Sequence, residues 1–481
     1  MPEKPFIGRT QELERLEALH KKSTPSLVVV KGRRRIGKSR LIAEFSSKHK
    51  KNVLWSFTGL APQDGMTSQS QRDYFARQLA LLLKIPPMTF QDWSDAFEHL
   101  SLHVQNGDMI LFDEISWMGD KDPSFIPKLK AWWDKQTAHI LTVFCGSVST
   151  WIEDNILKNT AFFGRVNLTL TLEPLSIPES AHLLKKIGFQ GSMYDIYKIL
   201  AVLGGIPWYL EQAGPGMTAD DIIKQLCFEK DGLLVLEFDR IFHDLFNGKG
   251  VTYKKILKSL EGGMKTLSEI RKAIGFSQSG TLSQLVDHLI IAGFVKKQNL
   301  WSFKTTKPLK QSLYRICDPY MRFYLKVVEP QRNKIDLSAF SNTPLSQLPG
   351  FDAHMGLQLE YLLLQNRSLL LKKIGISANE ILCDGPYRQQ KTASTQGCQI
   401  DYLVQTSTKN LFVCEFKFKR RELGSDIVDS VQNKIDVLKI PRGFAAVPIL
   451  FHIGGVSSSV ETNGYFYRVI DISELVENSI E

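Results

Sequence analysis

Cysteine is scarce in this sequence, and the few cysteines follow no motif. The 481 residues include six, with no CxxC pair among them: Cys145, Cys227, Cys317, Cys383, Cys398 and Cys414. A small scattered set argues against a disulfide framework and against a zinc site, and it favours a reducing compartment. We therefore expect a cytoplasmic protein.

Long apolar stretches are also missing. The most apolar runs, such as Leu27–Val30 and Leu79–Leu83, are far shorter than the ~20 residues that a helix needs to cross a bilayer. The first ten residues carry charge and no apolar stretch, so they show no signal pattern. No internal repeat or low-complexity tract is found. These absences predict a globular protein without a membrane span.

Acidic residues are fewer than basic ones. Lys and Arg number 60 against 50 Asp and Glu, which gives a formal charge of +10. Such an excess is compatible with binding to nucleic acid or to an anionic membrane surface, although many soluble proteins are mildly basic for no functional reason. The length is too great for one core and predicts about three domains.

Secondary-structure patterns divide the chain into four blocks and a connection, and they predict a multidomain α/β protein. In residues 1–175, helical periods alternate with β-branched runs at Leu27–Lys31, Val53–Phe57, Met109–Phe112 and Ile140–Gly146. That alternation indicates a parallel sheet with crossover helices. The later blocks are a helical region (176–248), three short helices with two strands (249–328), a connection rich in Pro, Ser, Asn and Gln (329–350), and an α/β region (351–481).

The first block contains a phosphate-loop pattern, GxxxxGK[ST], between an expected strand and an expected helix. Its residues are Gly32, Arg33, Arg34, Arg35, Ile36, Gly37, Lys38 and Ser39. The glycines allow backbone N–H groups to converge on phosphate oxygens at a helix N-terminus. Lys38 would reach the β- and γ-phosphates, and the Ser39 hydroxyl would ligate Mg²⁺. The three arginines favour anions, or they face solvent.

A second motif supports this site. The apolar strand Met109–Phe112 ends in Asp113 and Glu114. Asp113 suits the Mg²⁺ shell, and Glu114 suits a base that polarises the attacking water. Because the paired motifs share one geometry, the sequence predicts an ATPase that uses ATP and Mg²⁺.

Four motifs in order carry a family resemblance: Phe6-Ile7-Gly8-Arg9, the phosphate loop, the acidic pair, and Gly204-Gly205-Ile206-Pro207. Together they resemble AAA+ ATPases of a largely archaeal and bacterial family related to the STAND signalling NTPases. Members of that family carry a winged helix and a further C-terminal domain. The resemblance spans nearly the whole chain. It implies that Gly8, Arg9 and Pro207 lie at the nucleotide.

AAA+ proteins offer roles for two further residues. Ser147 follows the strand Ile140–Gly146, where such proteins keep a polar residue that orients the water. A capping or turn serine is an equal alternative. Arg165 could reach a γ-phosphate of its own or a neighbouring subunit as an arginine finger, or it is an ordinary loop arginine.

The middle block resembles a winged helix-turn-helix. Its expected elements are helices at Val251–Leu260, Thr266–Ile274 and Thr281–Ala292, a turn at 276–280, and strands at Phe294–Lys297 and Trp301–Lys304. In a DNA reader, Lys296, Lys297 and Lys304 would touch phosphates. The third helix has no Arg or Lys, so we favour a packing role. The aromatic and basic segment from Tyr314 to Tyr324 also favours packing over nucleic-acid binding.

The C-terminal block holds a third motif set. Glu360 lies on an expected helix, Asp401 follows a strand start, and Glu415 and Lys417 share one face of a strand by period-2 alternation. Antiparallel pairing of the two strands would bring Asp401 and Glu415 together as Mg²⁺ ligands.

This set resembles the PD-(D/E)XK nuclease fold, which implies that Glu360, Asp401, Glu415 and Lys417 fill its four usual roles. Gln432 stands where such nucleases sometimes place an auxiliary polar residue. Ile400 replaces the proline that often precedes the aspartate, and the basic run 417–421 suits a phosphate backbone. The alternative is a solvated Glu–Lys pair on an exposed strand.

The sequence therefore predicts ATP-dependent action on nucleic acid, on DNA rather than RNA, with Mg²⁺-dependent phosphodiester hydrolysis in the C-terminal domain. Self-association through the ATPase domain accords with this prediction. The main alternative is a nucleotide-gated signalling switch whose C-terminal domain binds DNA or a partner without cutting. A winged-helix transcription regulator is a third possibility.

Overall fold

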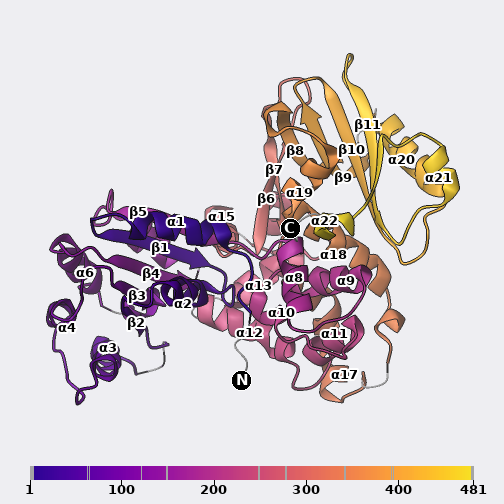
Figure 1. The fold of residues 1–481 in the computed structure, drawn as a ribbon. Coiled ribbons are helices and arrows are strands. Elements are labelled where there is room, and N and C mark those ends of the chain that lie inside the picture. Colours follow the sequence, from indigo (N-terminus) through magenta and orange to yellow (C-terminus); the bar gives the residue numbers. More distant parts are fainter. Residues whose placement is uncertain are drawn as a thin grey trace. The chain divides into compact units, whose positions relative to one another are not determined.

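A five-stranded parallel sheet forms the centre of residues 6–174 (Figure 1). In spatial order its strands are β2 (Leu54–Thr58), β3 (Met109–Asp113), β4 (Leu141–Ser147), β1 (Ser26–Gly32) and β5 (Val166–Leu172). The four strands expected from the sequence are confirmed, and β5 joins them. The computed structural model describes residues 5–61, 63, 65–120, 122–147, 150–246, 250–276, 279–340, 343–391, 393 and 395–477.

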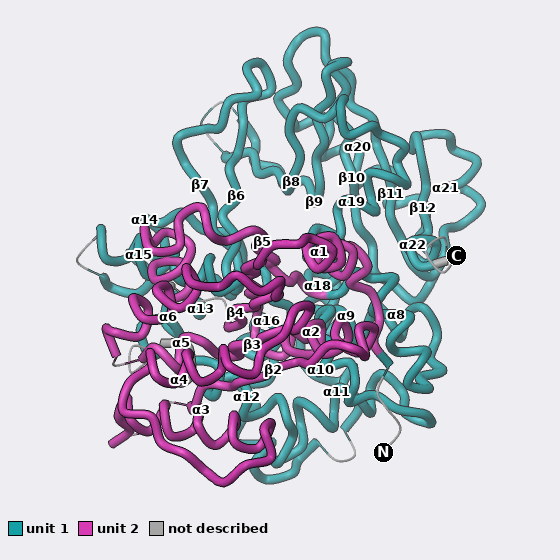
Figure 2. The backbone as a smooth tube through the Cα atoms, turned by 60° about the vertical axis from the view of Figure 1, so that its left-hand side comes forward, with its two compact units in different colours: residues 1–5, 175–481 teal, residues 6–174 magenta. Residues whose placement is uncertain are grey.

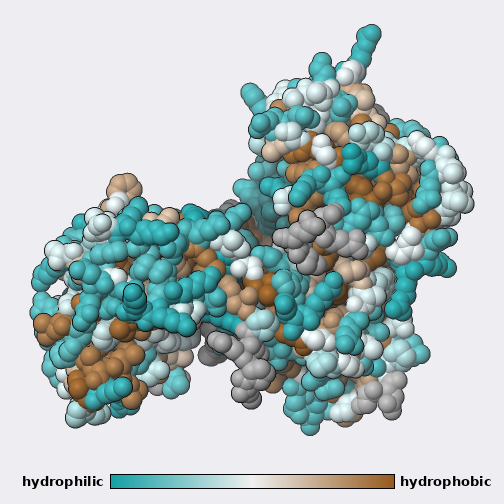
Figure 3. Space-filling view, viewed as in Figure 1, coloured by the Kyte–Doolittle hydropathy of each residue, from teal (hydrophilic) through white to brown (hydrophobic). Residues whose placement is uncertain are grey.

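Helices surround this sheet, which is why its central strands are buried on both faces. They are α1 (Thr10–His20), α2 (Lys38–Lys48), α3 (Ser68–Leu83), α4 (Trp93–Ser101), α5 (Ile115–Met118), α6 (Phe125–Asp134), α7 (Thr150–Ile152) and the π-turn η1 (Glu153–Leu157). Aromatic side chains such as Phe57, Phe75 and Phe97 fill the core between sheet and helices. Three apolar side chains near the end of α3 stay exposed, Leu81 at 79%, Leu82 at 40% and Ile85 at 42%, and Figure 3 shows apolar surface over this region.

Residues 175–481 form the second compact unit together with residues 1–5 (Figure 2). It begins with helices α8 (Ile177–Lys186), α9 (Met193–Leu203), α10 (Pro207–Leu210), α11 (Ala219–Cys227) and α12 (Leu233–Phe246). Capping boxes at Ser176, Ser192 and Thr218 fix where three of these helices begin. The helical character expected for residues 176–248 is therefore present over the residues described.

The middle of this unit has three helices and a hairpin. These are α13 (Gly250–Ser259), α14 (Leu267–Ile274), α15 (Ser279–Ile291), β6 (Val295–Trp301) and β7 (Pro308–Ile316). The second strand expected at Trp301–Lys304 is wrong: Trp301 ends β6, and the antiparallel partner begins only at Pro308. The predicted turn at 276–280 lies partly outside the described residues. We call residues 295–316 the wing hairpin.

The wing hairpin packs against the C-terminal sheet. Trp301 and Phe303 are buried in one apolar cluster with Ile400 and Leu403. The Trp301 indole donates to Gln405 Oε1 at 2.9 Å, and Gln405 Nε2 donates to the Phe303 carbonyl at 2.7 Å. These contacts support the packing role for the hairpin.

The expected connection at 329–350 is more ordered than its composition suggests. It contains the short helices η3 (Glu329–Gln331), α17 (Arg332–Asp336) and η4 (Leu345–Gln347). Ile335, Phe340 and Leu345 are buried. Most of the segment is thus part of the fold, held by buried apolar side chains together with these short helices.

A mixed five-stranded sheet forms the C-terminal region. Its elements in chain order are α18 (Phe351–Gln365), α19 (Arg367–Ile374), η5 (Ala378–Glu380), β8 (Ile381–Gln389), β9 (Cys398–Thr406), β10 (Asn410–Phe418), α20 (Asp426–Val437), β11 (Ala445–Ile453), α21 (Ser458–Thr462), β12 (Arg468–Asp471) and α22 (Glu474–Glu477). The spatial order is β12-β11-β10-β9-β8. Strands β8, β9 and β10 are antiparallel neighbours, whereas β10, β11 and β12 run parallel.

Among the described residues, no helix combines the length and the apolar character that a membrane span requires.

Candidate functional site

The phosphate loop joins the end of β1 to the start of α2. Gly37 has φ +94° at the N-cap of α2, a left-handed conformation that favours glycine. Lys38 is 6% exposed, and its Nζ donates to the carbonyls of Gly32 and Arg33, each at 3.3 Å. The lysine therefore lies folded over its own loop, where phosphate oxygens would replace the carbonyls as partners.

The four residues between the glycines serve different purposes. Ile36 is 1% exposed and packs beside Gly32, so its side chain anchors the loop and only its backbone can meet a ligand. Arg35 adopts φ +68°, which is uncommon for a residue other than glycine. Arg33 and Arg34 are partly exposed. The arginines thus surround the loop with positive charge.

The predicted Mg²⁺ ligands of this site meet across the sheet. The Ser39 hydroxyl donates to Asp113 Oδ2 at 2.6 Å. Asp113 ends β3, whereas Ser39 lies in the first turn of α2. A hydroxyl and a carboxylate oxygen at one point form a hard oxygen donor set, so these two residues fit Mg²⁺.

Glu114 directly follows β3 and contacts the end of the neighbouring strand β4. It has φ +48°, and its Oε2 accepts a hydrogen bond from the Ser147 N–H at 3.4 Å. Burial raises the pKa of Glu114, Lys38 opposes that rise, and Asp113 adds to it. A buried carboxylate with raised proton affinity suits a base that acts on water. Ser147, at the end of β4, makes this contact through its backbone, and the role of its side chain in orienting the water stays a prediction.

Arg9, the residue before α1, contacts the phosphate loop. Its backbone is left-handed at φ +63°, as is Gly8 at φ +74°. The guanidinium is 7% exposed and donates to the carbonyls of Glu173 at 2.7 Å and Ile36 at 3.4 Å. The guanidinium also pairs with Glu12 at 3.3 Å, so of these contacts only the one with Ile36 belongs to the loop, and through it Arg9 can hold the loop in shape.

Arg165 lies at the opposite edge of the sheet. It precedes β5, whose first residue Val166 pairs with Leu27 at the start of β1, whereas Gly32 pairs with Leu172. A strand of this length spans ~20 Å. Arg165 binds Asp134, with Nε to Oδ1 at 2.6 Å. An arginine finger within the same subunit does not fit this placement. The neighbouring-subunit form stays a prediction, and the pairing with Asp134 accords with the alternative of an ordinary loop arginine.

Pro207 begins α10 in the second compact unit. Gly205, two residues earlier, approaches Leu175 so closely that a Cβ would lie 2.0 Å from its carbonyl oxygen. The glycine is therefore required by packing of the backbone. The nucleotide contact expected for Pro207 stays a prediction.

The C-terminal acidic residues converge on β9 and β10. These strands pair antiparallel, as expected, with Cys414 opposite Tyr402. Asp401 Oδ2 accepts from the Phe416 N–H at 2.9 Å, and Lys417 Nζ donates to Glu415 Oε1 at 2.5 Å. Glu415 is 1% exposed, so the alternative of a solvated Glu–Lys pair is wrong.

A second lysine, missed in the sequence, completes this group. Lys434 Nζ on α20 lies 2.6 Å from Glu415 Oε2 and 4.0 Å from Asp401 Oδ1. Gln432, which was expected here, instead donates to Asp436 at the surface. Lys434 follows the buried Val431 by three residues, so helical spacing on α20 was the available signal.

Glu360 contributes a third carboxylate from α18, which packs against β10. Burial raises the pKa of Glu360 and Asp401 adds to the rise, while Arg322, Arg315 and Lys434 lower it. Burial and Glu415 likewise raise the pKa of Asp401. We call Glu360, Asp401 and Glu415, with Lys417 and Lys434, the acid cluster.

The acid cluster fits a cation in part. The Lys434 ammonium lies between Asp401 and Glu415, so positive charge is favoured at that point. In the part of the chain that the structure describes, however, no three His, Cys, Asp or Glu side chains gather closely enough to hold a metal ion. Two carboxylates and an ammonium are what the geometry offers.

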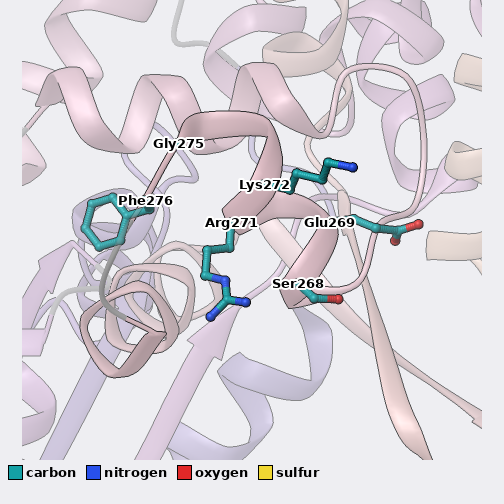
Figure 4. Close-up of a pocket in the computed structure, with 6 residues that line it drawn as sticks. All are labelled: Ser268, Glu269, Arg271, Lys272, Gly275 and Phe276. Atoms are coloured by element: carbon teal, nitrogen blue, oxygen red, sulfur yellow. The ribbon is translucent and has the colours of Figure 1, made fainter.

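Of two surface depressions, one lies at the acid cluster, and the other lies at α14 and is lined by none of the predicted site residues. One, of about 370 Å³, opens between β9 and α20 and is lined by Gly397, Cys398, Gln399, Asp401, Asn433, Lys434 and Val437. It gives solvent access to the acid cluster. The other, of about 540 Å³, surrounds α14 (Figure 4), and its side chains, including Arg271, Lys272 and Phe276, point in different directions rather than toward one another.

Comparison with known proteins bears on the first of these sites. Residues 6–213 match a family described as an ATPase domain predominantly from Archaea. An uncharacterized protein of Methanocaldococcus jannaschii is 24% identical over 338 residues, which are 70% of this chain and 71% of that protein. The matched domain contains the phosphate loop and the acidic pair.

Solved structures give weaker likenesses. The Aeropyrum pernix ORC2 protein is 12% identical with a TM-score of 0.42, over 70% of this chain and 98% of that chain. The A. pernix ORC1 protein in complex with DNA is 13% identical with a TM-score of 0.33, over 72% and 95%. A Thermotoga maritima RuvB mutant is 15% identical with a TM-score of 0.36, over 61% and 92%. These TM-scores are too low to carry a functional conclusion.

Proposed function

We propose that this protein, an ATPase through its domain at residues 6–213, acts on nucleic acid and cuts it in a C-terminal domain of the PD-(D/E)XK nuclease kind. The observation that carries the proposal is the acid cluster. Asp401, Glu415 and Lys417 come from two paired strands, and Glu360 comes from the helix packed on them. The element order α18-α19-β8-β9-β10-α20-β11 accords with that fold.

The roles within the acid cluster follow from charge. Asp401 and Glu415 would hold Mg²⁺, which when bound polarises the phosphodiester and activates water. Lys417 and Lys434 carry positive charge beside these carboxylates and can stabilise negative charge that develops on a phosphate. The depression between β9 and α20 gives a strand access to this point.

The roles at the phosphate loop follow in the same way. Gly8 and Arg9 support the loop, Lys38 binds the β- and γ-phosphates, and Ser39 with Asp113 would hold Mg²⁺. Glu114 accepts the proton of the attacking water, and the backbone of Ser147 keeps the carboxylate in place. Arg165 would act only on the nucleotide of a neighbouring subunit, and Pro207 would contact the nucleotide as the family resemblance implies.

A cleavage assay tests the nuclease proposal. Single-stranded, duplex and branched DNA, and RNA, are incubated with Mg²⁺ or Mn²⁺, with and without ATP. We expect cleavage by the wild type and none by Asp401→Ala, while ATP hydrolysis persists in the variant. Lys38→Ala should lose ATP hydrolysis. If the wild type leaves every nucleic acid intact, the nuclease proposal fails and the ATPase assignment does not.

A specific observation favours a second candidate, a nucleotide-gated switch that binds nucleic acid or a partner without cutting. The ammonium groups of Lys417 and Lys434 both pair with the Glu415 carboxylate. The described residues hold no group of three metal-binding side chains. Under this alternative, Asp401→Ala leaves the cellular phenotype unaltered, whereas Lys38→Ala removes it. The two variants therefore separate the candidates.

A further inference from the structure

The ammonium of Lys434 bridges two carboxylates of the acid cluster. Its Nζ lies 2.6 Å from Glu415 Oε2 and 4.0 Å from Asp401 Oδ1, so one side chain on α20 contacts residues of both β9 and β10. Lys417, by contrast, forms its ion pair with Glu415, at 2.5 Å from Oε1. In the described part of the chain, Lys434 is therefore the one of these two lysines that spans both carboxylates.

The oxygens that Lys434 contacts are those that the other partners leave. Asp401 Oδ2 accepts from the Phe416 N–H at 2.9 Å, and Glu415 Oε1 accepts from Lys417. Asp401 Oδ1 and Glu415 Oε2 remain, and Lys434 lies at both. Hard divalent cations bind carboxylate oxygens at ~2.0–2.6 Å. A cation shared by Asp401 and Glu415 would thus need the oxygens at which the ammonium lies.

Burial makes this contact strong. Glu415 is 1% exposed, and a buried carboxylate without a counter-charge is unfavourable, so the lysines stabilise it whenever no cation is bound. A divalent cation and an ammonium at the same oxygens repel each other. Burial strengthens that repulsion, because solvent screens it less. The cation and the Lys434 ammonium therefore compete for one position.

Lys434 has space to leave the carboxylates. Its side chain is 27% exposed, and it lines the depression of about 370 Å³ together with Asp401 and Asn433. A lysine carries a compact charge on a flexible four-carbon stem. Rotation about that stem can bring the ammonium from the carboxylates into the depression while α20 stays folded.

We propose that Lys434 is a built-in competitor for the divalent cation of the acid cluster. Its ammonium neutralises Asp401 and Glu415 until a cation displaces it, and it then turns into the depression, where it binds a phosphate of the nucleic acid. The inference rests on the proposed function, since it takes these two carboxylates as the cation's ligands. It deepens that function by making the cation concentration the signal that readies the site.

Mn²⁺ titration of the full chain tests the competition without turnover. All proteins are nucleotide-free and carry Asp113→Asn, so that the phosphate-loop site does not contribute. We expect Lys434→Met to bind Mn²⁺ about tenfold more tightly than the protein that keeps the lysine, because the competing ammonium is gone. Asp401→Ala should abolish this binding, which assigns it to the acid cluster.

Lys417→Met is the matched control, because Lys417 pairs with the same carboxylate from its own strand. Its removal should tighten Mn²⁺ binding about threefold or less, since a partly exposed ammonium that does not span both carboxylates acts only through its charge. Equal gains in the two lysine variants would overturn the inference, because charge alone would then set the affinity.

Lysine acylation followed by mass spectrometry tests the displacement without replacing Lys434. Saturating Mn²⁺ should raise the rate at which Lys434 is modified by about threefold or more, because the amine leaves its two carboxylates. Lys439, exposed just beyond α20, should react at an unchanged rate. A Lys434 rate that Mn²⁺ leaves unchanged would overturn the inference, whether or not Lys434→Met folds.

The outcomes separate this inference from the proposed nuclease. A wild type that cuts no nucleic acid, with tighter Mn²⁺ binding by Lys434→Met, would overturn the nuclease and support the competition. Cleavage by the wild type, with Mn²⁺ affinity unchanged in Lys434→Met, would overturn the competition and leave the nuclease. Absence of Mn²⁺ binding at the acid cluster in both proteins would also overturn the competition.

Discussion

At the residue scale, several side chains have roles that only their burial makes visible. Arg9 and Lys38 both donate to backbone carbonyls of the phosphate loop, Arg9 to that of Ile36 and Lys38 to those of Gly32 and Arg33. Arg9 is held there by Glu173 as well, whereas the contacts of Lys38 are the long ones that a phosphate can replace. Arg9 thus supports the shape of the loop, and Lys38 is the cation that can bind phosphate.

Arg9→Ala should therefore loosen the loop. We expect the free energy of unfolding to fall by about 2 kcal/mol, since charge-assisted hydrogen bonds are lost and carbonyls are left unsatisfied. ATP affinity should fall about tenfold, which corresponds to ~1.4 kcal/mol. Urea unfolding and calorimetric titration with ATP measure the two effects. Arg15→Ala, exposed on α1, is the control, and an Arg9→Ala variant with unchanged affinity would refute the supporting role.

His354 predicts how stability depends on pH. Burial, and then Arg322 and Lys326, lower the pKa of His354 to about 3 from 6.5. Between these values the unfolded chain binds the proton and the folded chain does not, so this residue's contribution to stability is lost as pH falls. At pH 5 the loss is about 2 kcal/mol relative to neutral pH.

The measurement compares wild type with His354→Gln by urea unfolding at pH 7 and pH 5. The difference between the two proteins should change by about that amount, with the wild type losing more stability at pH 5. The buried carboxylates of the acid cluster have raised pKa values and act in the opposite direction, but they are common to both proteins and cancel. A pH-independent difference would contradict the prediction.

At the element scale, the wing hairpin is the clearest case of a segment whose surroundings decide its use. Lys296 and Lys297 on β6 are exposed, as a DNA contact would require, but the following Trp301 is 4% exposed against the C-terminal sheet. The sequence predicted the packing role from the missing basic residues of α15. It placed the second strand wrongly: Trp301 ends β6 and pairs with Pro308, and the side chains of Trp301 and Phe303 are buried against the C-terminal sheet.

Trp301→Ala should therefore destabilise the second compact unit. We expect a loss of about 3–5 kcal/mol, the usual result of truncating a buried aromatic side chain, and Gln405 would lose the indole as a donor. Denaturant unfolding checks this value. Lys297→Ala on the same strand should change stability by less than about 0.5 kcal/mol. Comparable losses in both variants would mean that the hairpin is not anchored by its tryptophan.

At the scale of the whole molecule, the sequence predicted the features that nearby residues determine and missed those that depend on tertiary packing. The phosphate loop, Asp113 and the face shared by Glu415 and Lys417 are set by neighbours a few residues away, so local patterns predicted them. Lys434 reaches the acid cluster through tertiary packing, and its spacing of three residues from the buried Val431 on α20 was the available local signal. Arg165 looked suitable by its position in the chain, and only the strand register placed it at the far edge.

The two compact units should unfold separately. Residues 6–174 and 175–481 each have their own core, so calorimetry should resolve two transitions. Saturating ATP should stabilise the transition that includes the phosphate loop, by ~2.7 kcal/mol at one hundred times the dissociation constant. The Lys38→Ala protein should show no such shift. A single transition moved as a whole by ATP would contradict the prediction.

The contact between the wing hairpin and the C-terminal sheet also determines how late this part of the chain can fold during synthesis on the ribosome. The first unit is one continuous stretch and can close once β5 has left the exit tunnel. Trp301, by contrast, meets Gln405 across 104 positions of chain, so its indole waits in the nascent protein until β9 emerges. Pairing at that separation is slow to form, and the growing chain carries an exposed tryptophan and phenylalanine through that interval. The last third of the chain is therefore where a chaperone would be needed.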